Sequence, residues 1–283
     1  MSAGKIFDFD RMDTTFKVDN RFGGNVSRYA EYLETPDGRL RTDLTFANLR
    51  DVLREECRSL FALDLGCGTG ATAVRLARLG MQVTALDSSS AMVDLAKRTV
   101  IESGMEDKVA LKLGDANSVA ELFSPKSFDV VLCHNLLEYV DDPSTLLRGA
   151  AELMRDSSAI LSVLVRNQAG EVLKAALNAG DLTAAEDNLA AESGTESLYG
   201  GKVRFFTPDT LEEMVQGASL TVSTRMGVRV LSDYLPATIS RSAEYERIFA
   251  LERKLSRRSE FYGMARYLHC LAGRRAAVVE EGV

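Results

Sequence analysis

The stretch Asp64-Leu65-Gly66-Cys67-Gly68-Thr69-Gly70 closes an apolar run that begins at residue 61. Glycines adopt backbone conformations that are closed to other residues, and they let the chain approach a ligand closely. Ligands of open α/β sheets bind beyond the carboxyl ends of the strands, where such turns lie. The stretch therefore favours a ligand-binding turn between a strand and a helix; a tight turn with no ligand is the alternative.

The spacing of these glycines indicates which ligand the turn would hold. A dinucleotide site uses G-x-G-x-x-G, so that the pyrophosphate meets a helix N-terminus. Here Gly66, Gly68 and Gly70 form G-x-G-x-G, and Asp64 precedes them. A carboxylate in that place would repel a phosphate, but not a sulfonium that carries an amino-acid ammonium group. The pattern argues against a dinucleotide.

From residue 61 onward, short apolar runs alternate with segments that have the apolar periodicity of helices. Strands that are buried on both faces and separated by helices form parallel sheets with helices on either side. We therefore predict an α/β fold with a doubly wound, seven-stranded, mainly parallel sheet. The expected strands lie at 61–66, 81–87, 108–113, 128–133, 159–165, 219–226 and 264–272, and the helices between the first of them at 70–79, 90–103 and 143–155.

The length of 283 residues and the 46% hydrophobic content suit one large domain, so we predict a single domain over 1–283. Its expected parts are an N-terminal arm and helix (1–58), a cofactor-binding core (59–166), a helical lid insert (167–206), and C-terminal strands with a basic helix (207–283). The arm should contain turns at 22–25 and 35–38, then a helix at 42–57 with Leu49, Val52 and Leu53 on one face. Further helices are expected at 208–217 and 240–258.

The composition narrows the class of protein. A formal net charge of −7 does not suit a general nucleic-acid binder, although a local basic patch remains open. No apolar stretch approaches 18 residues and the first residues lack a signal-peptide pattern, so we expect a cytoplasmic protein with no membrane association. Four scattered cysteines and two histidines predict reduced thiols and no metal site. The oligomeric state stays open.

Two acidic residues follow the strands that come after the glycine turn. Asp87 ends the second strand, where an acid can accept both hydroxyls of an adenosine ribose. Asp115 follows the third strand, ahead of Ala116 and Asn117, where a carboxylate can reach an adenine amino group. A lone acid at a strand end is more often a turn former or a helix cap. Two acids in these places, behind that glycine turn, favour a nucleoside site.

This order of glycine turn, ribose acid and adenine acid, over residues 61–165, resembles the class I methyltransferases. The resemblance implies an enzyme that uses S-adenosyl-L-methionine as its methyl donor. A protein that binds the cofactor without catalysis is a less favoured interpretation. The residues expected at the cofactor are Arg41, Asp64, Gly66, Cys67, Gly68, Gly70, Asp87, Ser88, Met92, Asp115, Ala116, Asn117 and His134.

His134 follows the fourth strand, whose end would face the methionine part of the cofactor. Histidine can serve as a general base near neutral pH. The alternative is a neutral histidine that packs against the cofactor and donates one hydrogen bond. A sulfonium is already a good leaving group, so alignment of nucleophile, methyl and sulfur can dominate the rate. We therefore predict no catalytic residue from the sequence.

Segments outside the glycine turn resemble a narrower family, the bacterial enzymes that methylate the carboxyl of 5-carboxymethoxyuridine at the tRNA wobble position. The likeness runs from about residue 7 to 274. It implies that Arg41 grips the cofactor carboxylate, that His134 touches the cofactor, and that Asn167, Arg229 and Tyr234 lie near the acceptor. The segments are GRLR (38–41), LLEYVDDP (136–143), RNQAG (166–170), GVRV (227–230), DYL (233–235) and ARYLH (265–269).

The charge pattern leaves the acceptor open between tRNA and a small molecule. Residues 175–201 contain five acids and no Lys or Arg, and an acidic lid repels phosphate. Residues 239–275 carry nine basic residues and four acids, which could form an edge that docks RNA or simply a solvated helix face. On the helix we expect Arg247, Lys254 and Arg258 to share one face. The carboxylate of 5-carboxymethoxyuridine in tRNA is the leading acceptor, and a hydroxyl or carboxyl of a small molecule is the alternative.

Overall fold

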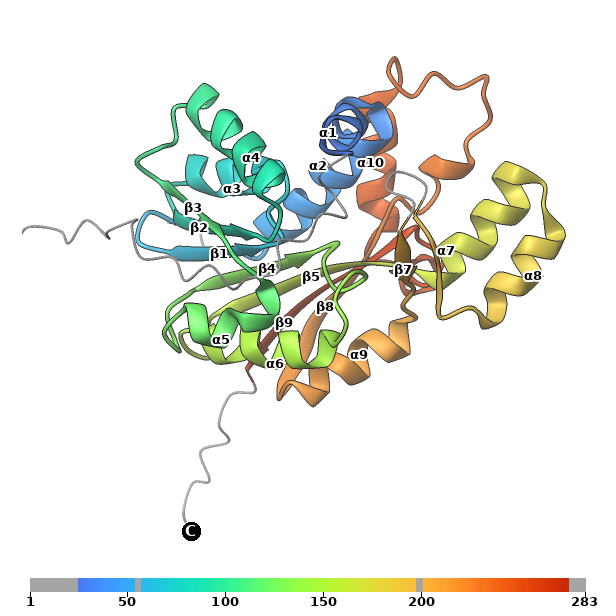
Figure 1. Cartoon of the computed structure of the whole chain (residues 1–283). Coiled ribbons are helices and arrows are strands. Elements are labelled where there is room, and N and C mark those ends of the chain that lie inside the picture. Colours follow the sequence, from blue (N-terminus) through green and yellow to red (C-terminus); the bar gives the residue numbers. More distant parts are fainter. Residues whose placement is uncertain (1–24, 54–56, 197–200, 275–283) are drawn as a thin grey trace, which may run out of the picture.

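Seven strands form one sheet in the order β3-β2-β1-β4-β5-β9-β8 in the computed structural model, which describes residues 25–53, 57–196 and 201–274 (Figure 1). Only β9 runs antiparallel to its neighbours, so the predicted doubly wound and mainly parallel sheet is confirmed. The strands are β1 (Phe61–Leu65), β2 (Gln82–Asp87), β3 (Val109–Leu113), β4 (Val130–His134), β5 (Ile160–Arg166), β8 (Leu220–Val228) and β9 (Tyr267–Arg274).

Helices cover both faces of this sheet (Figure 1). Alternate residues of each strand enter opposite cores: Leu63 and Leu65 pack with the helices 143–153 and 208–217, whereas Ala62 packs with the helices 71–78 and 90–102. This burial on both faces explains why the strands read as continuous apolar runs in the sequence. One layer holds α2 (Pro36–Arg50), α3 (Ala71–Arg78) and α4 (Ser90–Glu102), and the other holds α5 (Val119–Leu122), α6 (Pro143–Leu153) and α9 (Pro208–Gly217).

The strand order reverses direction between β1 and β4. From β1 the chain moves outward to β2 and β3, and it then returns to β4 and continues to β5 on the other side. The loops that follow β1 and β4 therefore part from each other, and ligands of open α/β sheets bind in the crevice at that point.

The N-terminal prediction was wrong in its boundaries. Two helices occur there, α1 (Val26–Glu34) and α2, and α2 begins at residue 36 instead of 42. The residues expected to form a turn at 35–38 start this helix, because Thr35 caps it by accepting from the Gly38 N–H and Pro36 occupies its first position. Helix α2 also ends earlier, at Arg50, and leaves Val52 37% exposed while Leu49 is buried.

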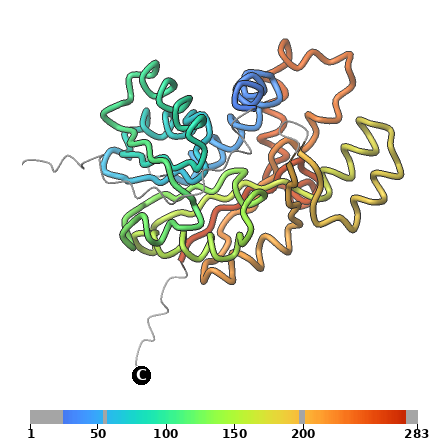
Figure 2. The backbone as a smooth tube through the Cα atoms, viewed as in Figure 1, coloured from blue at the N-terminus to red at the C-terminus, as the bar shows by residue number. Residues whose placement is uncertain are grey.

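The segment 167–206, expected to be helical, contains both helices and a hairpin. It comprises α7 (Gln168–Leu173), a π-helix η2 (Lys174–Ala179), α8 (Leu182–Ala190) and the two short strands β6 (Ser193–Thr195) and β7 (Lys202–Arg204). The helices pack on each other and project beyond the sheet, as the yellow part of the tube in Figure 2 shows. The hairpin was not predicted, since its strands are only three residues long.

Near the C-terminus, the predicted helix 240–258 is shorter and broken. Helix α10 (Tyr245–Leu255) ends before Arg258, which instead precedes α11 (Ser259–Tyr262). The expectation that Arg247, Lys254 and Arg258 share one helix face is therefore wrong for Arg258. Short 3-10 turns occur at η1 (Ala116–Ser118) and η3 (Ser232–Tyr234).

Two further features concern only the residues that the structure describes. Within 25–53, 57–196 and 201–274, no helix has the length and apolar character needed to cross a bilayer, and no three His, Cys, Asp or Glu side chains gather as metal ligands would. The four cysteines are buried and form no disulfide.

Candidate active site

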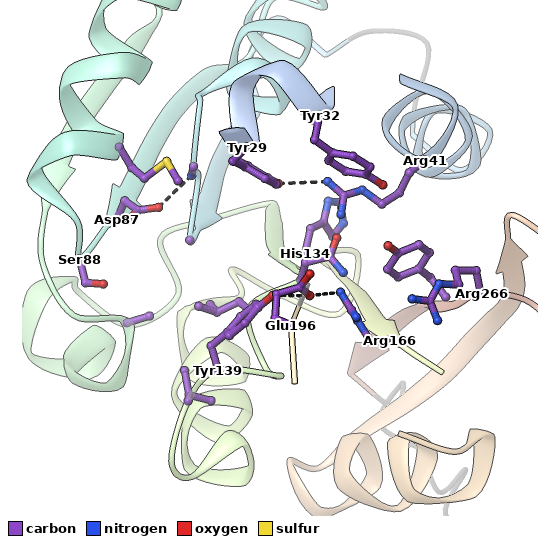
Figure 3. A pocket seen from close by; sticks show the side chains of 18 of the residues that line it. Tyr29, Tyr32, Arg41, Asp87, Ser88, His134, Tyr139, Arg166, Glu196 and Arg266 are labelled. Atoms are coloured by element: carbon purple, nitrogen blue, oxygen red, sulfur yellow. Dashed lines mark hydrogen bonds and ion pairs between the residues drawn. The ribbon is translucent and has the colours of Figure 1, made fainter. Parts of the chain in front are cut away.

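A cavity of about 860 Å³ opens at the carboxyl ends of the parallel strands, where the strand order reverses (Figure 3). Its size falls in the range of ligand pockets, roughly 300–1,000 Å³. One half is formed by the glycine turn after β1 and by the ends of β2 and β3. The other half is formed by β5, β8 and β9, with α1 and α2 contributing to the wall between them.

The glycine turn has the backbone geometry that its sequence predicts. Gly66, Gly68 and Gly70 all have positive φ, at 69°, 53° and 75°. A Cβ on Gly66 would lie 3.0 Å from the Leu136 side chain, and one on Gly70 would lie 3.0 Å from Ala96. Larger residues would be both strained and crowded, so the turn keeps its backbone open to the cavity.

Asp87 connects this turn to the end of β2. Its Oδ2 accepts from the Gly68 N–H at 2.9 Å, and its Oδ1 accepts from the Ser89 N–H at 3.0 Å. Each carboxylate oxygen can accept a second hydrogen bond, and Asp87 lines the cavity. The side chain is thus fixed in place at the wall of the cavity, with its carboxylate at the end of β2.

Asp115 caps a short helical turn and also faces the cavity, so it combines the two roles considered for it, helix cap and ligand acceptor. Its Oδ1 accepts from the backbone and side-chain nitrogens of Asn117, each at 2.9 Å, and so caps η1. Its Oδ2 accepts no hydrogen bond within the described residues, and the residue lines the cavity. Capping therefore uses one oxygen and leaves the other for a donor such as an adenine amino group.

Asp64 lies behind the glycine turn, 3% exposed, in a separate small cavity of about 60 Å³. Its Oδ2 has no hydrogen-bond partner among the described residues. Burial, with a contribution from the nearby Asp87, raises the pKa of Asp64 to about 7. A buried carboxylate of this kind is stabilised when a cation approaches.

Arg41 enters the cavity from α2 and is 7% exposed. Its Nη2 donates to the Tyr29 hydroxyl at 3.1 Å, and its Cζ lies 5.2 Å from the Tyr32 ring centroid and 5.6 Å from that of Tyr267 (Figure 3). No carboxylate of the described residues lies within ion-pair distance of it. Since buried charges are normally paired, the arginine is suited to an anionic ligand.

The half of the cavity beneath β5, β8 and β9 is rich in arginine, and these arginines are ion-paired. Arg166 pairs with Glu171 at 3.2 Å and with Glu196, and Arg266 pairs with Glu171 at 2.6 Å. Arg229, which has a positive φ of 60°, donates through Nε to Asp233 at 2.7 Å. The pairs hold several guanidinium groups at one wall.

Tyr267 lies among these arginines, 4% exposed. Burial alone would raise the pKa of its hydroxyl, but the positive charges of Arg41, Arg166, Arg229 and Arg266 outweigh burial and lower that pKa to about 8. The arginines thus favour the phenolate form of Tyr267, although most of them have acidic partners.

His134 lies between the two halves of the cavity (Figure 3). Its Nε2 is 2.8 Å from the Ser162 hydroxyl, which lies in turn 2.8 Å from Nε2 of His269. Burial, reinforced by the charge of Arg41, lowers the pKa of His134 to about 3. The imidazole is neutral at physiological pH, and a proton would bind to it only weakly.

The structure brings most of the sequence-predicted site residues together but leaves five of them elsewhere. Asp64 and Cys67 line only the small cavity, and Gly70, Asn167 and Tyr234 line neither cavity. Asn167 is fully buried and donates to the carbonyls of Gly263 and Ala265, so it holds α7 against the chain before β9. The main cavity is lined by Arg41, Gly66, Gly68, Asp87, Ser88, Met92, Asp115, Ala116, Asn117, His134 and Arg229.

Sequence reasoning missed several residues that line the main cavity. Arg266 and Tyr267 lie in the ARYLH segment, which contributed to the family resemblance but was given no role. Tyr29 and Tyr32 recur at helical spacing in α1, a signal that was available but was assigned to an irregular arm. Lys174, Asn178 and Glu196 come from 167–206, where no pattern in a single sequence identifies them.

Comparisons with known proteins agree with this geometry. Residues 63–161 match a family model described as a methyltransferase domain. The chain is 29% identical over 246 residues to the tRNA 5-carboxymethoxyuridine methyltransferase of Escherichia coli K12, covering 84% of this chain and 89% of that protein. It is 37% identical over 123 residues, 42% of this chain and 49% of that protein, to a ubiquinone biosynthesis O-methyltransferase of Xanthomonas euvesicatoria.

Solved structures show the same fold at low sequence identity. An S-adenosylmethionine-dependent methyltransferase from Thermotoga maritima, described as a possible histamine N-methyltransferase, superposes with a TM-score of 0.61 at 15% identity, covering 90% of this chain and 99% of that one. A putative methyltransferase of Haloferax volcanii, solved with a methyltransferase activator, has a TM-score of 0.61 at 18% identity, covering 92% and 98%. With the fold, the glycine turn and these matches in agreement, the chain is a class I S-adenosylmethionine-dependent methyltransferase that resembles the tRNA 5-carboxymethoxyuridine methyltransferases.

Proposed function

We propose that this methyltransferase transfers the methyl group of S-adenosylmethionine to the carboxylate of 5-carboxymethoxyuridine in tRNA. In this proposal the cofactor lies over the glycine turn, with its ribose on Asp87, its adenine near Asp115 and its carboxylate on Arg41. A tRNA substrate would make the cytoplasm its place of action.

The charges of the cavity support this orientation of the cofactor. Asp87 and Asp115 offer acceptors to a nucleoside at the ends of β2 and β3. The buried Asp64 favours a nearby ammonium or sulfonium cation, and Arg41, which has no acidic partner among the described residues, favours a carboxylate. A zwitterionic amino acid joined to a nucleoside would meet Asp87, Asp115 and Arg41 in the main cavity with charges of the right sign, while Asp64 would act on its cation from behind the glycine turn.

The observation that carries the choice of acceptor is the gathering of arginines at one wall of the cavity. Arg166, Arg229 and Arg266 lie at the ends of β5, β8 and β9, and together with Arg41 they lower the pKa of the buried Tyr267 hydroxyl. A wall of this kind attracts an anion and would hold a carboxylate by bidentate or single hydrogen bonds. Arg229 stays in the proposed acceptor site, whereas Asn167 and Tyr234 do not.

The chemistry of a carboxylate acceptor fits a site without an efficient base. A carboxyl group is already ionised at neutral pH, so its oxygen can attack the methyl group directly and displace the thioether. His134, with its pKa near 3, would be a poor general base at neutral pH. The role left to the protein is to align the oxygen, the methyl carbon and the sulfur.

We also propose that 167–206 acts as a lid over the acceptor. Lys174, Asn178 and Glu196 of this segment line the cavity. Glu196 joins the segment to the sheet through its ion pair with Arg166. A lid that closes over the site would exclude water from the reacting groups.

A small-molecule O- or carboxyl methyltransferase is the second candidate, and surface charge favours it. The acids Asp181, Glu186, Asp187 and Glu192 of the proposed lid are on the surface and would repel a phosphate backbone. The match to ubiquinone biosynthesis O-methyltransferases also fits this candidate, although it covers only half of those proteins.

The two candidates are separated by where labelled methyl goes. Purified protein and labelled S-adenosylmethionine are added to a cell extract divided into an RNA fraction and a small-molecule fraction. The tRNA proposal predicts label in RNA, with incorporation that falls steeply as salt rises, because bound counterions are released from several phosphates. Label confined to the small-molecule fraction, with little dependence on salt, would favour the second candidate.

A further inference from the structure

A buried row of polar side chains leads from the surface of α10 to His134 in the cavity. It begins at Arg253 and passes through Asn48, His269 and Ser162. The side chains of Asn48, His269 and Ser162 are fully buried. Neighbouring groups are separated by 2.9 Å, 3.4 Å, 2.8 Å and 2.8 Å. The row crosses α10, α2, β9, β5 and β4, so five elements must be in register to form it.

Arg253 fixes the orientation of the Asn48 amide. A guanidinium group only donates hydrogen bonds, and its Nη1 contacts Oδ1 of Asn48. The amide nitrogen Nδ2 must therefore be the atom that faces Nδ1 of His269. Since Nδ2 only donates, Nδ1 of His269 must accept and can carry no proton.

The same reasoning fixes each of the next groups. A neutral His269 with a bare Nδ1 carries its proton on Nε2 and donates it to the Ser162 oxygen. The serine hydroxyl has one proton, and among the described residues its only other hydrogen-bond neighbour is Nε2 of His134. If both imidazoles donated to Ser162, its hydroxyl proton would have no acceptor in this buried place.

His134 must then carry its proton on Nδ1. That nitrogen makes no hydrogen bond within the described residues, and the ring borders the cavity between Arg41 and Arg166 (Figure 3). Both imidazoles are held neutral, because burial lowers the pKa of His269 well below its usual value and lowers that of His134 to about 3. The cavity is thus offered one N–H donor and no lone pair.

We propose that Asn48, His269 and Ser162 are positioning residues that hold His134 as the neutral Nδ1–H tautomer, ready to donate to a carboxylate oxygen bound in the cavity. Two carboxylates could supply that oxygen, the one in the amino-acid part of the cofactor or the one on the acceptor. The proposal rests on the proposed function only for the identity of this carboxylate. The tautomer of His134 is a property of the protein without any ligand.

The whole chain has only two histidines, so nuclear magnetic resonance of protein with nitrogen-15 in histidine reads this row directly. The expected spectrum near neutral pH shows two neutral rings, His269 protonated on Nε2 and His134 on Nδ1. An Nε2-protonated His134, or an imidazolium at either position, would overturn the proposal.

Two variants test the coupling along the row. Asn48→Asp keeps the contact with Arg253 but replaces the donor to His269 by an acceptor; at pH above 8 it should move the proton of His269 to Nδ1 and that of His134 to Nε2. Ser162→Ala removes the link and should leave His134 in a mixture of tautomers while His269 stays Nε2-protonated. A charge-matched surface change, Gln216→Glu on α9, should alter neither ring. If His134 keeps its Nδ1 proton in both Asn48→Asp and Ser162→Ala, its tautomer does not depend on the row, and the proposal is contradicted.

Ligands identify the carboxylate that His134 meets. If it is the cofactor's carboxylate, S-adenosylhomocysteine should shift the Nδ1 resonance of His134. The ligand 5′-methylthioadenosine, which lacks the amino-acid part, should not shift it. Ser162→Ala should then weaken the binding of S-adenosylhomocysteine and leave that of 5′-methylthioadenosine unchanged. If it is the acceptor's, the shift appears only with tRNA that contains carboxymethoxyuridine, and the KM for that tRNA rises roughly tenfold in Ser162→Ala. No response of Nδ1 to any of the three would overturn its role as donor. Failure of methyl transfer to tRNA, with the tautomers as expected, would reject the proposed acceptor alone.

Discussion

The guanidinium carbon of Arg41 lies 5.6 Å from the centroid of the Tyr267 ring, and both side chains line the main cavity. Arg41 comes from α2 and Tyr267 from β9, which are more than 200 residues apart in the chain. The pair joins the part of the cavity proposed for the cofactor carboxylate to the part proposed for the acceptor. Binding of an anion by Arg41 should therefore be felt by the phenol of Tyr267.

Among the tyrosines that the structure describes, Tyr267 alone is expected to have a pKa below the ordinary value. Its phenolate absorbance should appear near pH 8 and should be missing in Tyr267→Phe. Because the folded state then releases its proton before the unfolded state does, the free energy of unfolding should rise between about pH 8 and the ordinary value of 10.0 and gain nothing below that window.

S-adenosylhomocysteine should raise this pKa again, since its carboxylate would offset the charge of Arg41. At a pH just above 8, added ligand should reduce the phenolate absorbance. An unchanged absorbance on saturation would mean that the carboxylate does not reach Arg41.

Arg41→Met should weaken the binding of S-adenosylhomocysteine by roughly 10- to 100-fold, the usual cost of losing a hydrogen bond to a charged group. Calorimetry with 5′-methylthioadenosine should give nearly equal affinity for variant and parent, because that ligand has no carboxylate. Arg39→Met is the matched control, for Arg39 lies on the same helix but is mostly exposed and pairs with Asp43. Equal losses for both ligands would assign Arg41 to the shape of the pocket instead of to the anion.

Asp64 should make the ligand-free protein less stable as pH rises. Burial and Asp87 raise its pKa from 3.8 to about 7, so between these values the folded state holds a proton that the unfolded state has lost. The free energy of unfolding should fall through that window, and Asp64→Asn should remove this part of the fall. Asp94→Asn, at an exposed position of α4, serves as the control.

Much of the sheet could be predicted because burial on both faces leaves a continuous apolar run in each strand. The β1 turn was equally readable, since three glycines at that spacing have few other uses, and the structure gives all three a positive φ. The start of α2 was misjudged although Thr35 and Pro36 are a recognisable helix start, because the same residue types also form turns.

The arginine wall could not be predicted in the same way. Arg166, Arg229 and Arg266 come from three different strand ends, and only the pairing of β5, β9 and β8 brings them together around Tyr267. Contacts of this kind depend on tertiary register, which leaves no periodic signal in one sequence. The same applies to Asn48 and His269, which are 221 residues apart and meet through the packing of α2 on the sheet.

The basic stretch 239–275 offers fewer free cations than the sequence suggested. Arg253 and Arg257 pair with Asp51, Arg274 donates to a backbone carbonyl, and Arg247 pairs with Glu244 at 2.7 Å. Arg247 and Lys254 remain exposed and seven positions apart, on one helix face.

If tRNA docks on that face, changing Arg247 and Lys254 to Glu should weaken tRNA binding and reduce the slope of log affinity against log salt by about two. Affinity for S-adenosylhomocysteine should be unchanged. The matched control changes Lys97 and Arg98 of α4, both exposed, to Glu. If both double variants weaken tRNA binding to the same extent, the effect comes from net charge and not from a docking face.

The proposed acceptor is tested most directly by mass spectrometry of nucleosides from tRNA incubated with the protein and S-adenosylmethionine. One batch of tRNA should contain 5-carboxymethoxyuridine, and a matched batch should contain unmodified uridine at that position. We expect the first batch alone to gain one methyl group, on carboxymethoxyuridine, and to lose it again in mild alkali, as an ester does. No gain in either batch, under conditions in which the protein binds its cofactor, would contradict the tRNA proposal; a methyl group that survives alkali would contradict the carboxylate as acceptor.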